Sequence, residues 1–98
     1  MVDVMNMLLL LLPGVATTYY GEEIGMVNVR ISFEDTQDPQ GKNAGRELYT
    51  LLSRDPCRSP MQWNAGKNAG FSTAEKTWLP VNENIQNCNV QVRLIYNY

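Results

Sequence analysis

Residues 7–23 read MLLLLLPGVATTYYGEE, and the prediction of the fold begins from this stretch. The apolar run completes a helix over residues 1–12 that is apolar on most sides and is stopped by the Pro-Gly pair at 13–14. Residues 15–20 are β-branched and aromatic and end at Gly21, which predicts a strand. Because this strand lacks polar alternation, it is typical of a parallel sheet that is covered on both faces. A buried helix, a short turn and a buried strand together predict an α/β fold.

Two carboxylates follow the expected strand, in the segment Gly21-Glu22-Glu23. In α/β barrels the carboxyl ends of the strands carry the active site, so this position is a candidate site. Neighbouring side chains on an extended chain point to opposite faces, however, whereas a glycosidase needs two carboxyls on one substrate. We therefore expect a structural role for the pair. In the alternative, one carboxylate faces a site and the other packs against an arginine.

The composition excludes several classes of function. A chain of 98 residues is at most one small domain, and its net charge of -2 argues against a nucleic-acid partner, which would require a basic patch. The sequence contains no histidine, which excludes the commonest zinc ligand and the Ser-His and Cys-His dyads. We expect no metal and no cofactor. Cys57 and Cys88 either pair in an oxidising compartment or remain separate thiols.

The apolar N-terminal run is too short to span a membrane, which takes about 18 to 20 residues. The only early charge is Asp3, whereas a signal peptide begins with a cationic region. We therefore interpret residues 1–12 as the end of a buried helix. The sequence supplies no cellular address of its own.

Residues 28–52 contain turn-forming residues at nearly every second position and predict a loop. Glu34, Asp35 and Asp38 are expected to be solvated there, because the EF-hand calcium pattern is absent. Residues 46–52 are expected to close the loop with two helical turns.

The string GKNAG occurs at residues 41–45 and again at 66–70. Two copies are too few for a repeat architecture, so both are expected to form glycine-centred turns. Residues 88–98 begin with an alternation of apolar and polar side chains, which predicts an edge strand.

The segment SRDPCRSPMQWN, residues 53–64, combines two arginines with two prolines and a tryptophan. Asp55 and Ser59 each precede a proline and are therefore restricted to extended conformations. A stiff segment lowers the entropy cost of holding a side chain in one place for binding. Arg58 lies between the prolines, and its planar fork of donors can orient a carboxylate or several sugar hydroxyls. Arg58 is the functional candidate of this segment.

A purely structural interpretation of the same segment also stands. In it, Arg54 and Asp55 form a local ion pair and Arg58 is a surface charge. Met61 and Trp63 then fill the core, although the Trp63 ring could instead stack on the face of a sugar.

Four strings in this chain resemble one enzyme family: LLLLLPGVATTYYGEEIGM, ISFEDTQDPQG, SRDPCRSPMQWN and NAGFSTAEKTWLPVN. In this order they are similar to the end of the catalytic barrel in alpha-glucosidases of glycoside hydrolase family 13, and above all to insect maltases. The resemblance implies the α/β class, as a largely irregular fragment of a (β/α)8 TIM barrel. Residues 1–12 would be the helix before the eighth strand, residues 15–20 that strand, and long loops would follow. Residues 1–91 are expected to be this C-terminal barrel fragment and residues 92–98 a divergent tail.

The resemblance also implies roles for single residues. In the family, the arginine before Ser/Thr-Pro-Met-Gln-Trp lines the subsite for the terminal glucose, which implies that Arg58 binds the sugar substrate. The residues expected to support the pocket structurally are Tyr20, Gly21, Glu22, Glu23 and Trp63.

The family's chemistry implies that this chain lacks catalytic residues. Retaining hydrolysis uses an aspartate nucleophile, a glutamate acid/base and a second aspartate, all on strand ends before the eighth strand. None of those motifs occurs in this sequence, so we expect no hydrolysis by the isolated chain. The complete parent is expected to be a maltase that cleaves maltose-like alpha-1,4 glucosides in carbohydrate metabolism. In the parent family such proteins are secreted or anchored to the outside of the membrane.

Two alternatives stand beside this prediction. Heavy chains of amino-acid transporters carry a related, non-catalytic barrel, so the parent could be a binding or chaperone subunit. The chain could also be a non-functional remnant, since one strand of a barrel leaves its edges unpaired. An upstream Asp/Glu/Asp set would favour the enzyme, whereas a single upstream membrane span without that set would favour the heavy chain.

Overall fold

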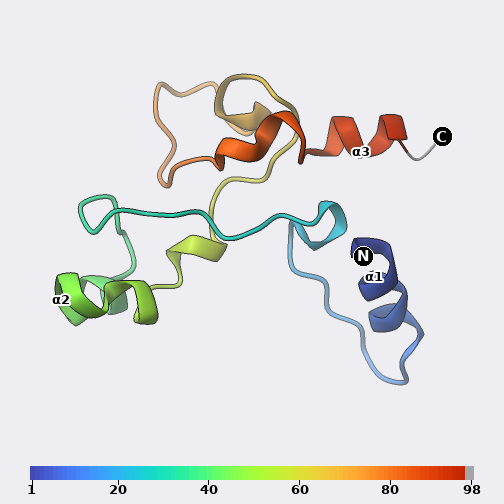
Figure 1. The fold of residues 1–98 in the computed structure, drawn as a ribbon, viewed down its shortest axis with the longest axis horizontal. Coiled ribbons are helices and arrows are strands. Elements are labelled where there is room, and N and C mark those ends of the chain that lie inside the picture. Colours follow the sequence, from blue (N-terminus) through green and yellow to red (C-terminus); the bar gives the residue numbers. More distant parts are fainter. Residues whose placement is uncertain (97–98) are drawn as a thin grey trace.

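The computed structural model describes residues 1–96 (Figure 1). Within this range, three α-helices and four short 3-10 turns are joined by long irregular segments. The helices are α1 (Val2–Leu11), α2 (Pro39–Leu52) and α3 (Val90–Tyr96), and the 3-10 turns are η1 (Glu22–Ile24), η2 (Asp55–Cys57), η3 (Lys67–Gly70) and η4 (Glu83–Gln86). In Figure 1, α1 and α2 lie at opposite ends of the longest axis.

The helix expected over residues 1–12 forms as α1, but the strand expected at residues 15–20 does not form. Residues 15–19 are irregular, and Val15 is 97% exposed. A strand exists only where a neighbouring strand completes its backbone hydrogen bonds, and residues 1–96 contain no other strand. The strand prediction is therefore wrong for this chain alone, which is helical and irregular where an α/β step was expected.

Helix α2 occupies much of the segment that was predicted to be a loop. The Asp38 carboxylate caps it by accepting the Gln40 N–H at 3.2 Å, and Pro39 occupies the first turn. Gly45 adopts φ 76° and ψ 171°, which interrupts the helix at the end of the first GKNAG copy. The two helical turns predicted at residues 46–52 are confirmed. The loop predicted for the preceding residues is wrong, because the Asp-Pro pair starts a helix.

The second GKNAG copy forms the predicted tight turn. Asn68 and Ala69 both have left-handed backbones, with φ 50° and 54°. The carbonyl of Ala69 accepts the backbone N–H groups of Trp63 and Asn64 at 2.9 and 3.1 Å. The turn therefore folds back onto the end of segment 53–64.

Helix α3 stands where an edge strand was predicted. The buried Asn89 side chain accepts the Val92 N–H at 2.8 Å and so caps the first turn. The first two N–H groups of the helix donate to the carbonyls of Gln62 and Trp63. The strand prediction is wrong because this cap and these long-range bonds favour a helix over a short alternating pattern. Residues 97–98 of that prediction lie outside the described residues.

The hydrophobic core is small. Val29, Ile31 and Leu79 form one buried cluster, and Met61 and Ala69 are also buried. The molecule measures 44 × 35 × 19 Å, with a radius of gyration of 15.4 Å. A compact domain of this length has a radius of gyration of about 13 Å. The described chain is therefore an open, flattened arrangement around few buried side chains.

Candidate functional site

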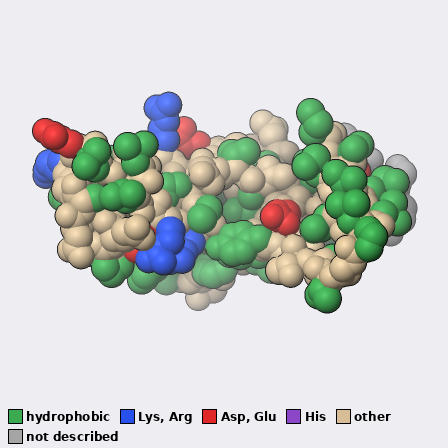
Figure 2. All heavy atoms as spheres, turned by 90° about the horizontal axis from the view of Figure 1, so that it is seen from below, with side chains coloured by type: hydrophobic (Ala, Val, Ile, Leu, Met, Phe, Trp, Pro, Cys, Tyr) green, Lys and Arg blue, Asp and Glu red, His purple; other side chains and the backbone are tan. Residues whose placement is uncertain are grey.

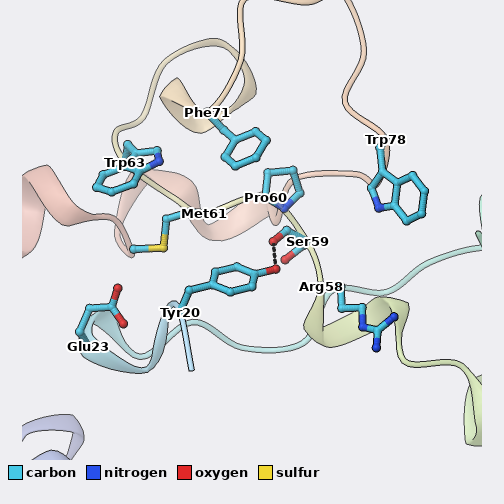
Figure 3. A pocket seen from close by; sticks show the side chains of 9 residues that line it. All are labelled: Tyr20, Glu23, Arg58, Ser59, Pro60, Met61, Trp63, Phe71 and Trp78. Atoms are coloured by element: carbon cyan, nitrogen blue, oxygen red, sulfur yellow. Dashed lines mark hydrogen bonds between the residues drawn. The ribbon is translucent and has the colours of Figure 1, made fainter. Parts of the chain in front are cut away.

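A cleft of about 580 Å³ lies between the segment after α1 and the segment 53–64 (Figure 3). This volume is within the range of about 300 to 1,000 Å³ that is usual for small-molecule sites. The lining residues are Tyr20, Glu23, Arg58, Ser59, Pro60, Met61, Trp63, Phe71 and Trp78. Aromatic and apolar side chains dominate the walls, and Glu23 and Arg58 supply the charges.

Tyr20 joins the two sides of this cleft. Its hydroxyl donates a hydrogen bond to the carbonyl of Ser59 at 2.8 Å, as Figure 3 shows. Partial burial raises the pKa of the Tyr20 hydroxyl, and the neighbouring Tyr19 adds to this effect. The hydroxyl therefore stays protonated at neutral pH and remains a donor. A residue of the expected strand is thus tied to the proline-rich segment 39 positions later.

Two buried carboxylates hold the first half of segment 53–64. Asp38 accepts three hydrogen bonds from Arg54, from its backbone N–H at 2.8 Å, from Nε at 2.9 Å and from Nη2 at 2.7 Å. These bonds hold the pKa of the Asp38 carboxyl well below its usual range. Asp55 accepts the backbone N–H groups of Gln37 and Asp38 at 2.6 and 2.8 Å.

Two predictions are corrected by this arrangement. The local Arg54–Asp55 ion pair is wrong, because Arg54 binds Asp38 instead and Asp55 faces backbone donors at the start of α2. Asp38 was expected to be solvated, but its side chain is fully buried against Arg54. Together the two carboxylates connect α2 to the turn that precedes Arg58.

Arg58 differs from Arg54 in its surroundings. Its backbone N–H donates to the carbonyl of Asp55 at 2.8 Å, which ends η2 and places Arg58 at the rim of the cleft. Within residues 1–96, its guanidinium takes part in no ion pair or side-chain hydrogen bond. Figure 3 shows the guanidinium pointing outward, with Glu23 on the other side of the Tyr20 ring. The planar donor fork is therefore available to a ligand.

The structure separates the members of the Tyr-Gly-Glu-Glu segment. Tyr20 and Glu23 line the cleft, whereas Gly21 and Glu22 do not. The Glu22 carboxylate accepts the N–H of Tyr19 at 3.2 Å and so stabilises its own turn. Gly21 is buried with φ 90°, a conformation that favours glycine. Neither carboxylate forms an ion pair with an arginine within residues 1–96.

The Met-Gln-Trp run divides between the core and the cleft. Met61 is buried at 6% exposure, as the structural interpretation predicted, but Trp63 is 50% exposed and lines the cleft. Gln62 is fully buried and donates to Asn84 Oδ1 at 2.9 Å and to the carbonyl of Cys88. Trp63 is thus not a core residue, because the anchored Gln62 directs its neighbour outward.

Phe71 and Trp78 form a part of the wall that sequence reasoning missed. They are 53% and 68% exposed and follow the left-handed turn of η3. Both lie in the string NAGFSTAEKTWLPVN, which carried the resemblance. No local pattern indicated that they face Tyr20, because the turn at Asn68 and Ala69 brings them there.

The two cysteines are separate thiols. Cys57 is exposed, whereas Cys88 is half-buried with its Sγ 3.5 Å from the carbonyl oxygen of Ile24. Burial raises the pKa of the Cys88 thiol, so this group stays protonated at neutral pH. Across residues 1–96, no group of three or more His, Cys, Asp or Glu side chains is placed to hold a metal ion.

The sequence profile described as "Alpha amylase, catalytic domain" matches residues 1–97. The chain therefore belongs to the alpha-amylase catalytic-domain family, whose fold is a TIM barrel. Within this family it is similar to insect alpha-glucosidases and maltases. It is 59% identical over 81 residues to an alpha-glucosidase of Apis mellifera and 57% identical over 90 residues to Maltase 1 of Drosophila virilis. The family resemblance predicted from the four strings is confirmed.

The alignments cover most of this chain but a small part of its relatives. They include 83% and 91% of the chain, and 14% of the length of both insect proteins. An amino acid transporter heavy chain of Homo sapiens is 47% identical over 92 residues, which are 94% of this chain and 12% of that protein. Both kinds of parent that the sequence suggested are therefore found among the relatives.

Proposed function

We propose that this chain forms one wall of the glucose-binding cleft of an alpha-glucosidase of the maltase type. The parent enzyme hydrolyses terminal alpha-1,4-linked glucose with retention, and Arg58 contacts the sugar. The observation that carries this proposal is the free guanidinium of Arg58 at the rim of a cleft with aromatic walls. The relatives named alpha-glucosidase and maltase support the substrate class. Salivary alpha-glucosidase of Aedes aegypti, 50% identical, supports an extracellular parent.

Sugar recognition combines flat apolar surfaces with hydrogen-bond donors. The rings of Tyr20, Trp63 and Trp78 offer apolar faces to the C–H face of a glucose ring. The fork of Arg58 offers several donors to its hydroxyl groups. The Tyr20–Ser59 hydrogen bond supports a wall that is organised before the sugar arrives.

We further propose a place for this chain in the barrel. Residues 1–12 precede the eighth strand, residues 15–20 become that strand once neighbouring strands pair with it, and residues up to 91 form the following loops. Residues 92–98 diverge from the family. The exposure of Val15 supports this assignment, since an apolar, unpaired segment is suited to insertion in a sheet. The catalytic carboxylates come from other strands, so the 98-residue chain alone does not hydrolyse maltose.

A chimera tests the role of Arg58. The 98-residue chain replaces the segment that it matches in the Apis mellifera alpha-glucosidase, and glucose release from maltose is measured. We expect the chimera to be active and Arg58→Ala to lower its kcat/KM about 10- to 100-fold, which corresponds to loss of hydrogen bonds from a charged group.

The control is Arg54→Ala in the same chimera. It leaves Asp38 buried without its partner, so we expect less folded enzyme but an unchanged kcat/KM per folded molecule. Equal kcat/KM of the Arg58→Ala chimera and its parent would contradict the assignment of Arg58. Glucose release by the purified 98-residue chain would contradict the proposal that the catalytic carboxylates lie elsewhere.

A second candidate function rests on the 47% identity to the transporter heavy chain. The parent would then be a non-catalytic ectodomain of the same barrel family. In that case the pocket wall has no need to hold a sugar, and the chimera would fold with normal stability yet release no glucose. Restoring the Apis segment in place of this chain would recover the activity.

A further inference from the structure

Helix α1 is apolar around most of its surface, yet none of its residues is buried. Its large, exposed apolar side chains are Val4, Met5, Met7, Leu8, Leu10 and Leu11. At 3.6 residues per turn, they occupy more than half of the circumference of the helix. A helix with so wide an apolar surface is normally buried in a larger body.

Only the N-terminal end of α1 is held by the rest of the chain. Asp3 forms an ion pair with Arg93 of α3. Val2 packs so closely on Gly25 that a Cβ there would lie 2.6 Å from its Cγ2. The second half of α1 projects away from the molecule, and Figure 2 shows apolar side chains gathered at this end. The free part of the helix is therefore an interaction surface.

The accessible surface of the chain is also too large for an independent domain. It amounts to 7260 Å². A folded monomer of this mass exposes about 5,700 Å², so the excess is roughly 1,600 Å². A standard protein interface buries about 800 Å² on each partner. The excess is therefore about twice the size of a standard contact and fits an obligate partner.

Two other occupants fit this surface less well. Helix α1 has ten residues and is about 15 Å long, half the thickness of the hydrocarbon core of a bilayer. In residues 1–96, no helix has the length and hydropathy to span a membrane. A second copy, related by a two-fold axis, would cover one side of the helix and leave other apolar side chains in water. A groove formed by several elements of a larger body covers all of them.

We propose that α1 inserts into such a groove in the complementary part of an alpha-amylase catalytic domain, and that the 98-residue chain binds that part as a separate polypeptide. The chain matches 14% of the length of the Apis mellifera protein, so the complementary part holds the rest of the barrel. Its elements supply the apolar surface that α1 lacks and the strand edges that residues 15–20 lack. This inference rests on the family and the exposed surface, and it is independent of maltase activity.

Co-expression tests the interface. The tagged 98-residue chain is produced together with Apis mellifera alpha-glucosidase from which the matched segment has been deleted. We expect the two chains to co-purify and to form a one-to-one complex by size-exclusion chromatography with light scattering. The double variant Leu8→Glu, Leu11→Glu places charges on the free half of α1, and we expect it to weaken binding at least tenfold. Thr50→Glu, an equally charged and exposed position on α2, should bind like the wild type.

Circular dichroism of the separate variants provides the folding control, because Leu8 and Leu11 are 52% and 77% exposed and their replacement removes no buried contact. Failure of the wild-type chain to form a complex would overturn the inference, as would equal binding by the double variant. A homodimer that the double variant dissociates, or binding of neutral phospholipid vesicles that it abolishes, would assign α1 to another occupant. Glucose release by the complex reports separately on the proposed function, since an inactive one-to-one complex still supports the interface.

Discussion

Two arginines of one segment have different functions because their carboxylate neighbours differ. Arg54 directs its backbone and side-chain donors to Asp38, which caps α2 with the same carboxylate. Arg58 has no such partner within residues 1–96 and lies at the cleft. Both follow similar local patterns beside prolines, so only long-range contacts distinguish the structural arginine from the candidate ligand.

At the residue scale, Asp38→Asn is expected to lower the midpoint of thermal unfolding of the chain. The Arg54 hydrogen bonds lower the pKa of Asp38 in the folded state below its unfolded value of about 3.9. The stabilisation from ionised Asp38 is therefore complete above that value and is lost as the pH falls through the folded pKa. The difference between wild type and variant should be constant from about pH 5 to pH 7 and shrink below about pH 4.

Circular dichroism melts at a series of pH values measure this difference. Glu47→Gln changes an exposed carboxylate of α2 and serves as the control, with no effect on the midpoint expected. A difference between wild type and Asp38→Asn that persists unchanged at low pH would contradict the role of the ionised carboxylate.

At the element scale, the tight turn after residues 15–20 depends on Gly21. Its φ of 90° disfavours any other residue, and the N–H of Met26 donates to its carbonyl at 2.9 Å. A Cβ at this position would lie 2.6 Å from Met26 Sδ and 2.9 Å from its Cβ. The turn places Tyr20 and Glu23 in the cleft, so the geometry of the site depends on this glycine.

We expect Gly21→Ala to destabilise the chain by about 1 to 3 kcal/mol, from the strained backbone and the contact with Met26. In urea unfolding, the double variant Gly21→Ala, Met26→Ala should relieve the contact while the backbone strain remains. Its coupling energy is therefore stabilising relative to the two single changes. Additive effects of the two changes would show that the Met26 contact is not responsible.

At the scale of the whole molecule, stability depends on few buried side chains. Leu79 is fully buried and packs with Val29 and Ile31, which come from a distant part of the chain. Since small domains are stable by only about 5 to 15 kcal/mol, a core of this size leaves little reserve. Complementary barrel elements that cover the exposed apolar surface would supply the missing burial.

Leu79→Ala should cost about 2 to 5 kcal/mol, because it opens a cavity in this core. Leu51→Ala removes the same atoms from a residue that is 78% exposed and should change stability by less than about 0.5 kcal/mol. Urea unfolding followed by circular dichroism compares the two variants. Similar losses for both would mean that the Val29–Ile31–Leu79 cluster does not hold the chain together.

The residues alone were sufficient to predict the family, the helix α1, the helical turns at 46–52, the turn in the second GKNAG copy and Arg58 as the candidate ligand. Each depends on local propensity or on motifs that read along the chain. Tertiary contacts decided the rest. Residues 15–20 stay irregular because no strand pairs with them, α3 is a helix because Asn89 and the carbonyls of residues 62–63 satisfy its first turn, and Arg54 binds Asp38 across 16 positions. Hydrogen-bond partners far apart in sequence leave no local pattern, so only the folded chain reveals them.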